Sequence, residues 1–510
     1  MSKQEAFFKH ITEGNTNKGE YITLGSAMLD GKTIKNAFVN VPLKTMNRHG
    51  LIAGATGTGK TKTLQVLAEN LSEKGIPVIL MDIKGDLSGL ARPSPGHAKI
   101  DERHEAIGLP FEPKAFPVEI LTLSAQNGVK LRATISEFGP VLISRILDVT
   151  ETQAGIISVI FKYCDDNKLP LLDLKDFKKI LQYATDEGKK EFEEAYGRIS
   201  TASTGAILRK IVELEQQGGD LFFGEKSFDP QDLLRVDENG RGYINIIRLT
   251  DIQDKPKLFS TFMLSLLAEI YSTFPEQGDT GRPELIMFID EAHLIFNEAS
   301  KALLNQIESI VKLIRSKGVG LYFVTQNPTD VPEAVLSQLG LKVQHALRAF
   351  TAKDRKAIKL TAQNYPDTEY YDTANVLTSL GTGEALVSAL NEKGRPTPLA
   401  ATMMRAPMSR MDILTDTELE NLLNNSKLVK KYNEEVDRES AYEMLNEKIE
   451  HAEAEELKEK ARKEKEALEK AKSKSTSSRK STRMNPIVKV LTSATFIRSV
   501  FGILTKVMKK

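Results

Sequence analysis

The chain has 510 residues, 40% hydrophobic and 27% charged, which is ordinary for a globular protein and leaves ample apolar material for a core. Its 70 basic and 69 acidic residues give a net charge of +1, so a site for a polyanion must be a local patch or a pore lining. The single cysteine excludes internal disulfides and cysteine metal clusters and fits a reducing compartment. The sequence has no signal-like start and no run of about 18 apolar residues, so we expect a cytoplasmic protein without a membrane span.

Residues 1–48 predict a small β-rich region. Residues 21–24 and 37–41 are rich in strand-forming side chains and are separated by turn formers. A region this short is expected to pack onto the core that comes after it in the chain. Arg48 and His49 at its end either form a structural turn or touch a nucleotide or a neighbouring subunit.

Residues 54–61 read GATGTGKT and match the phosphate-binding pattern GxxxxGK(S/T) without substitution. The apolar run 50–53 predicts a strand before this loop, and the apolar spacing of residues 64–71 predicts a helix after it, which favours a nucleotide site over a loop without a ligand. Glycines let backbone N–H groups point at phosphate oxygens, Lys60 reaches the β- and γ-phosphates, and the Thr61 hydroxyl is placed to bind Mg²⁺. The predicted nucleotide-binding residues are Gly54, Ala55, Thr56, Gly57, Thr58, Gly59, Lys60, Thr61 and Lys62.

The apolar run 77–82 predicts a strand buried on both faces of a parallel sheet. Ligands collect at the carboxyl edge of such sheets, so the segment DIKGD after this strand is expected in the catalytic crevice. Asp82 and Lys84 in this segment either orient phosphate or Mg²⁺-bound water, or cap the next turn.

From 138 to 240 the pattern changes to apolar residues three and four apart, which predicts a helical insertion between strands of the core. This insertion could grip a partner or roof the site. Its expected helices cover residues 138–163, 174–183 and 199–216.

The sheet is predicted to resume at 242–247, and five apolar residues at 285–289 then lead into Asp290 and Glu291. A buried strand ending there delivers Asp290 to the Mg²⁺ shell, while Glu291 can polarise the attacking water. The adjacent acids favour hydrolysis through the additional-strand class of P-loop proteins over a kinase, and no guanine-reading motif supports a GTPase. His293 either contacts the γ-phosphate or a subunit, or is satisfied locally.

A helix predicted at 300–316 carries Arg315 near its end and precedes a buried strand at 319–326. The amide of Gln326, at the carboxyl end of that strand, could bond the γ-phosphate or the lytic water and report hydrolysis. In the alternative, Thr325 and Gln326 bond only to their own turn. The remaining elements of the core are expected to be a strand at 342–350, a helix at 352–362, and a hairpin of strands 384–388 and 398–404.

Beyond residue 410 the composition shifts to charged helix formers, with opposite charges four apart such as Glu459 and Lys463, which predicts a solvated spacer helix. The tail 474–510 has nine basic residues, no acid and one apolar stripe. It could dock on the protein itself or its oligomer, lie on an anionic membrane, or contact DNA phosphates. The expected organisation is 1–48 lead-in, 49–137 first core part, 138–240 insertion, 241–410 second core part, 411–472 charged helical extension, and 473–510 linker and basic tail.

The chain resembles the HerA–FtsK superfamily of P-loop ATPases over residues 20–405, through the motifs GATGTGKT, DIKGD, FIDEAH and VTQ in this order and spacing. It is also similar to bacterial HerA-like ATPases of the YjgR type, through the segments NRHGLIAGATGTGKT and DIKGDLSGLA. The resemblance implies an α/β, RecA-like core with a mainly parallel, doubly wound sheet, assembled as a ring, expected to be a hexamer, with ATP at subunit interfaces and a channel for double-stranded DNA. It implies that Lys60 and Thr61 bind phosphates and Mg²⁺, Asp290 completes the Mg²⁺ shell, Glu291 is the catalytic base and Gln326 the sensor. Arg315 would reach a neighbour's ATP, with Arg348 and Arg355 as alternatives.

Two departures from this family affect the functional hypothesis. The N-terminal region is shorter than the barrel of HerA, and the winged helix and membrane anchor of the FtsK kind are missing. The first hypothesis is an Mg²⁺-dependent ring ATPase that translocates or remodels double-stranded DNA, with a nuclease or another protein as partner. The alternative is an ATP-driven scaffold or protein-remodelling ring that acts through its C-terminal tail without DNA.

Overall fold

The computed structural model describes residues 2–252, 255–278, 280–298, 301–434, 436 and 438–475. The chain divides into two compact units, Met1–Leu445 and Asn446–Lys510. The predicted tail helix, with the alternatives for its contacts, lies outside the described residues. Within the described ranges, no helix has the length and apolar character that a membrane crossing requires.

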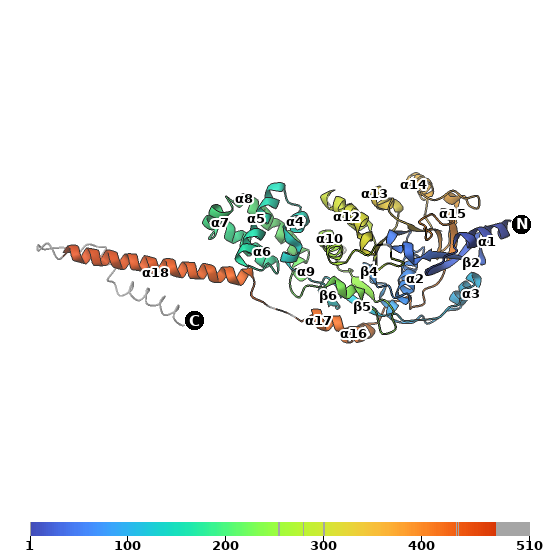
Figure 1. The fold of residues 1–510 in the computed structure, drawn as a ribbon, viewed down its shortest axis with the longest axis horizontal. Helices are drawn as coiled ribbons and strands as arrows, with labels where there is room; N and C mark the ends of the chain where they lie inside the picture. Colours follow the sequence, from blue (N-terminus) through green and yellow to red (C-terminus); the bar gives the residue numbers. More distant parts are fainter. Residues whose placement is uncertain are drawn as a thin grey trace. The chain divides into compact units, whose positions relative to one another are not determined.

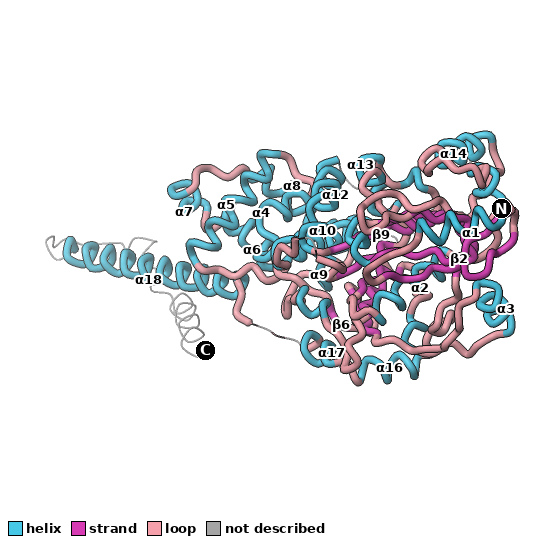
Figure 2. Tube along the Cα trace, turned by 45° about the vertical axis from the view of Figure 1, so that its right-hand side comes forward, coloured by secondary structure: helices cyan, strands magenta, loops and turns pink. Residues whose placement is uncertain are grey.

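A twelve-stranded sheet in the order β2-β1-β12-β11-β10-β3-β9-β8-β4-β7-β5-β6 forms the centre of the first unit (Figures 1 and 2). The run from β10 to β6 is parallel, and the strands from β11 to β2 are antiparallel. The sheet is therefore mainly parallel, as predicted. Its strands are β1 (Tyr21–Leu29), β2 (Lys32–Pro42), β3 (Gly50–Ala53), β4 (Val78–Asp82), β5 (Val118–Thr122), β6 (Val129–Lys130), β7 (Ile244–Arg248), β8 (Leu285–Ile289), β9 (Val319–Thr325), β10 (Leu341–His345), β11 (Glu384–Ser388) and β12 (Ala400–Met404).

Helices cover the sheet and form the insertion, whose members α4 to α8 gather into one bundle in Figure 1. Their bounds are α1 (Lys3–Gly14), α2 (Lys60–Glu73), α3 (Ala98–Ile107), α4 (Ile135–Ile146), α5 (Glu151–Asn167), α6 (Leu174–Thr185), α7 (Lys189–Ala195), α8 (Thr201–Gln216), α9 (Gly219–Phe222), α10 (Pro256–Thr273), α11 (His293–Glu298), α12 (Lys301–Leu313), α13 (Glu333–Leu336), α14 (Ala352–Ala362), α15 (Thr373–Ser379), α16 (Asp416–Asn424), α17 (Lys427–Tyr432) and α18 (Ala441–Ser475).

Two element predictions were wrong in detail. The helix expected over 138–163 is two helices, because Thr150 caps a new helix through a reciprocal pair of hydrogen bonds with Gln153 and Asp148 takes φ +48°. The strand expected over 342–350 ends at His345, where its partner β3 also ends and the chain turns into the loop before α14. Helices α1, α3, α7, α9, α13 and α15 were not predicted.

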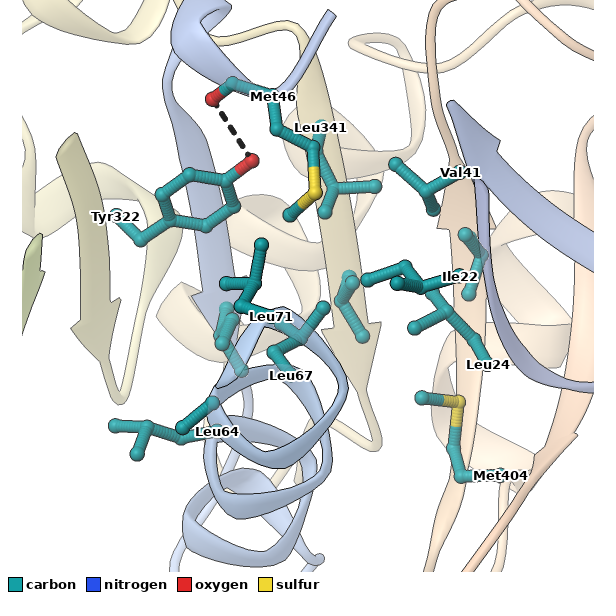
Figure 3. Packing of buried hydrophobic residues seen from close by; sticks show 14 of the residues in the cluster. Ile22, Leu24, Val41, Met46, Leu64, Leu67, Leu71, Tyr322, Leu341 and Met404 are labelled. Atoms are coloured by element: carbon teal, nitrogen blue, oxygen red, sulfur yellow. Dashed lines mark hydrogen bonds between the residues drawn. The ribbon is translucent and has the colours of Figure 1, made fainter. Parts of the chain in front are cut away.

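The core beneath the phosphate-binding loop is shared by distant parts of the chain. Figure 3 shows Leu64, Leu67 and Leu71 of α2 in one cluster with Ile22 and Leu24 of β1, so the N-terminal strands belong to the same core as the central sheet. In the same view the Tyr322 hydroxyl of β9 donates a 3.1 Å hydrogen bond to the Met46 carbonyl. The predicted apolar face of α2 is confirmed as buried.

Candidate active site

The loop between β3 and α2 has the backbone that an anion-binding loop requires. Gly54, Gly57 and Gly59 take φ values of +152°, +77° and +115°, in the left-handed region that favours glycine. A Cβ on Gly54 would lie 2.5 Å from the Cβ of His345, so this position also lacks space for a side chain. The amides of Thr56 and Gly57 are exposed and donate no hydrogen bond to the part of the chain that the structure describes. Unpaired amides in a glycine-rich loop suit phosphate oxygens.

Lys60 lies folded back onto this loop. Its Nζ donates to the Gly54 carbonyl at 2.7 Å and to the Ala55 carbonyl at 3.2 Å. Burial lowers the pKa of Lys60, the charge of Lys84 lowers it further, and Glu291 and Asp290 oppose both effects. Thr61 is half-buried in the first turn of α2.

The ammonium group of Lys62 faces a segment far along the chain, and the binding of nucleotide by this residue stays a prediction. Its Nζ donates to the Met411 carbonyl at 2.7 Å. We name residues 405–412 the C-terminal strap, because it lies along the polar side of α2. Gln65 donates to the Ser409 hydroxyl at 2.7 Å, and the fully buried Glu69 accepts from the amides of Met408 and Ser409 at 2.8 and 2.9 Å. No pattern in the sequence signals these contacts.

A neutral histidine anchors the same helix from beneath. The Nδ1 atom of His345 lies 2.8 Å from the Glu384 carbonyl, which can only accept, so Nδ1 carries the proton and Nε2 accepts from the Thr63 hydroxyl at 2.9 Å. Burial lowers the pKa of His345 to about 4. This residue was also missed by sequence reasoning, since Thr63 and His345 lie 282 positions apart.

Asp290 and Glu291 follow β8 and are both buried. The Asp290 carboxylate accepts a 2.9 Å hydrogen bond from the Glu291 amide, and burial raises its pKa to about 6 although the charge of Lys84 opposes the shift. Glu291 takes φ +46°, an uncommon backbone conformation for a glutamate at the end of a strand. His293 lies beside this acid, with Nδ1 3.3 Å from Glu291 Oε2, and its contact with a γ-phosphate or a subunit stays a prediction.

Lys84 forms ion pairs with Asp290 and Glu291, while Asp82 caps the turn that follows β4. The Nζ of Lys84 is 2.6 Å from Glu291 Oε1 and 3.8 Å from Asp290 Oδ2. Burial alone would lower the pKa of Lys84, but the two carboxylates outweigh it and the pKa is raised. The Asp82 carboxylate accepts three hydrogen bonds from backbone amides, those of Gly85, Asp86 and Leu87. The capping alternative therefore holds for Asp82, whereas Lys84 pairs with the acids, and its contact with phosphate stays a prediction.

Thr325 and Gln326, the polar pair at the end of β9, differ in their surroundings. Thr325 pairs with Ala53 in the sheet and donates a 2.5 Å hydrogen bond to Asp330 of its own turn. Gln326 is exposed at the edge where the phosphate-binding loop begins. A strand-end amide in that place can reach a ligand held by the loop.

Arg315 lies at the opposite edge of the sheet. It directly precedes β9 in the short 3-10 helix Ile314–Lys317, next to His49, whose pKa is lowered to about 4 chiefly by burial and also by the charge of Arg315. His49 donates to the Val311 carbonyl and accepts from the Leu321 amide, so its structural-turn alternative holds. A strand of this length spans roughly 20 Å, so the structure does not bring Arg315 to the loop of its own chain. Arg348 and Arg355 are exposed beyond the carboxyl end of β10.

The arrangement defines a class of protein. Strand β9 lies between β3, which carries the phosphate-binding loop, and β8, which carries the buried acid pair. A parallel strand between these two, together with the adjacent acids that Lys84 contacts, fits the additional-strand class of P-loop NTPases that the acid pair predicted. The predicted RecA-like fold class is confirmed.

The chain belongs to the family described as Helicase HerA-like C-terminal, whose model matches residues 28–509. It is 23% identical over 376 residues to the DNA double-strand break repair helicase HerA of Sulfolobus acidocaldarius, covering 70% of this chain and 66% of that protein. It is 23% identical over 387 residues to the DNA import protein CedB of the same organism, covering 76% of this chain and 55% of the relative. The chain thus spans less than two thirds of the length of these relatives.

Among solved structures, the bacterial conjugative coupling protein TrwBdeltaN70, in a trigonal form in complex with sulphate, resembles this chain with a TM-score of 0.50 and 16% identity. The likeness covers 80% of this chain and 94% of that one and shows a common fold. The predicted HerA-like, P-loop ATPase family is confirmed. The closer similarity to YjgR-type proteins stays a prediction.

Proposed function

We propose that this protein hydrolyses ATP between the phosphate-binding loop and the Asp290–Glu291 pair, and that it works in the cytoplasm as a ring motor, hexameric as in the HerA–FtsK type, on double-stranded DNA. The observation that carries the proposal is the buried acid pair, which is separated from the loop strand by one strand, contacts Lys84 and shifts the pKa of Lys60. The DNA repair helicase and the DNA import protein among the relatives support the choice of polymer.

The residues present fit Mg²⁺-ATP. The loop amides and the N-terminus of α2 would hold the phosphates, and Lys60 would neutralise them after leaving the carbonyls of Gly54 and Ala55. The Thr61 hydroxyl and the Asp290 carboxylate are hard oxygen donors of the kind Mg²⁺ prefers, and the ion when bound would neutralise charge on the β- and γ-phosphates. Glu291 Oε2 is buried and accepts no hydrogen bond from the described residues, so this oxygen of the proposed base has no fixed donor.

In the proposed reaction, water attacks the γ-phosphorus, Glu291 accepts the water's proton, and ADP leaves with the phosphate as the second product. Gln326 would orient the attacking water or the γ-phosphate from the end of β9. Arg315 would contribute its guanidinium to the ATP of a neighbouring copy, because it lies at the edge of the sheet away from its own loop. This geometry supports a homo-oligomer in which each site is completed by a second chain.

The test is ATP hydrolysis by purified protein, with Glu291→Gln as control, titrated with duplex DNA at low and moderate salt. We expect loss of activity in the variant and stimulation by DNA that falls as salt rises, since phosphate contacts release counterions. Mixing Glu291→Gln subunits with Arg315→Ala subunits should restore part of the activity, because some interfaces then combine an intact Glu291 with an intact Arg315. A DNA-independent rate would instead favour the protein-remodelling ring, and no recovery on mixing would remove Arg315 from the site.

A further inference from the structure

Lys84 forms an ion pair with Glu291, the proposed catalytic base. Its ammonium group is 2.6 Å from Glu291 Oε1, on a side chain that is 40% exposed. The backbone beneath it is held in place, because the buried Asp82 carboxylate binds the amides of Gly85, Asp86 and Leu87. Lys84 therefore extends from a fixed backbone, and its four-carbon stem has rotatable bonds that can redirect the ammonium group without rearranging the loop.

The contact holds Glu291 in a state that cannot act on water. Oε1 is paired with a full positive charge, and Oε2 is buried from solvent with the imidazole of His293 3.3 Å away. An ammonium group at this distance stabilises the charged carboxylate and fills the direction from which water would donate a proton. Proton transfer from water to Oε1 therefore requires that Lys84 leaves.

A bound triphosphate supplies the charge that would draw Lys84 away. Strand β4, which leads into Lys84, is paired with β8, which leads into the acids, and Met81 lies opposite Ile289 at the ends of both strands. The ammonium group of Lys84 contacts both acids, and Lys60 lies near enough for the charges of Lys84, Glu291 and Asp290 to shift its pKa. The two lysines thus converge on the space in front of the acid pair, where the terminal phosphate of a nucleotide on the loop must lie for Glu291 to activate water against it.

We propose that Lys84 binds the γ-phosphate of ATP and in doing so releases Glu291, so that the base becomes available only when a γ-phosphate is present. The inference rests on the function proposed above and adds a substrate-binding residue to it. ADP offers no γ-phosphate, so Lys84 returns to Glu291 after hydrolysis and phosphate release. The ion pair of this structure is the resting state of that cycle.

The test is calorimetric binding of Mg²⁺-ADP and of the hydrolysis-resistant analogue Mg²⁺-AMP-PNP to wild type, Lys84→Ala and Lys84→Arg. Lys114→Ala is the matched control, since Lys114 is also 40% exposed and pairs with a glutamate, Glu73, at 2.9 Å. We expect Lys84→Ala to lose affinity for AMP-PNP by about tenfold or more, the range of a hydrogen bond to a charged group, with ADP affinity within about twofold of wild type. Lys84→Arg should keep most of the preference for AMP-PNP, and Lys114→Ala should not change it.

Steady-state kinetics supply a second readout. Lys84→Ala should raise the KM for ATP and lower kcat, whereas a purely structural role would lower the affinities for both nucleotides together. Equal losses for ADP and AMP-PNP, or no loss for either, would overturn the inference and leave the proposed ATPase intact. Failure of the wild type to bind either nucleotide would overturn the proposed function together with the inference.

Discussion

Replacement of His345 by glutamine should change how the stability of this protein responds to acid. His345 is fully buried beneath the phosphate-binding loop, and its neutral ring joins Thr63 of α2 to the Glu384 carbonyl. Its pKa falls from 6.5 to about 4 on folding. Between pH 6.5 and about 4, His345 binds a proton in the unfolded chain but stays neutral in the native protein. The stability due to His345 is therefore present above pH 6.5 and is lost as pH falls toward 4. At 1.36 kcal/mol per pH unit, this contribution is about 3 kcal/mol.

Other buried groups titrate in the same range with the opposite sign. Burial raises the pKa of Glu69 to about 7 and those of Asp82 and Asp290 to about 6, so the native protein binds these protons first and gains stability as pH falls through this range. The wild-type curve is therefore a composite of opposing contributions. The difference between wild type and His345→Gln isolates the contribution of one ring.

The assay is urea denaturation of both proteins at intervals from pH 7.5 to 4.5, with His451→Gln on the exposed surface of α18 as control. At pH 7.5 the variant should be less stable by about 1–3 kcal/mol, because the Thr63 hydroxyl and the Glu384 carbonyl lose their buried partner. This difference in the free energy of unfolding should shrink toward pH 4.5. The wild type loses the stability due to neutral His345 as pH falls, whereas the variant has no such contribution to lose. A gap that stays constant over the whole range would refute the neutral, doubly bonded ring on which the reasoning rests.

Two further substitutions test how α2 is held. Glu69→Ala leaves the amides of Met408 and Ser409 buried without an acceptor. Urea denaturation should therefore show that the free energy of unfolding falls by about 2–5 kcal/mol. A decrease below about 1 kcal/mol would contradict the role of the C-terminal strap. Gly54→Ala places a Cβ against His345 at a left-handed φ, so calorimetry should show nucleotide affinity reduced by about tenfold or more. Gly31→Ala, also at positive φ but with open space around it, should leave that affinity unchanged.

Most of the central sheet could be predicted because parallel strands buried on both faces read as short apolar runs. Strands β4 and β8 are runs of this kind that end in an acid, and β9 ends in a polar pair, so the sequence also placed their functional ends at one edge. The loop before α2 was predictable for a different reason, since its glycines and Lys60 are fixed by local backbone geometry. The N-terminal strands were predictable as strands, but their pairing with β12 was not, because residues 25 and 404 share no local signal.

The ion pair between Lys84 and Glu291 marks the limit of that reasoning. The sequence placed both residues at the carboxyl edge and left open whether Lys84 faced a phosphate or capped a turn. The choice depends on a neighbouring strand, because β4 and β8 are adjacent in the sheet although about two hundred residues separate them. Strand order is set by packing across the whole domain and leaves no trace in the periodicity of either strand.

The polar side of α2 has an environment that periodicity alone does not reveal. Lys62, Gln65 and Glu69 recur three and four apart opposite the apolar face, which in an amphipathic helix indicates a solvated side. In the folded protein Gln65 and Glu69 are instead buried, because the C-terminal strap supplies hydrogen-bond partners for each. A buried carboxylate is retained only where such partners exist, so the strap must form whenever α2 docks in its native place. The helix that begins at the nucleotide site is therefore held on both sides, by the apolar core and by a segment more than three hundred residues away, and a shift of α2 on nucleotide binding has to move the strap with it.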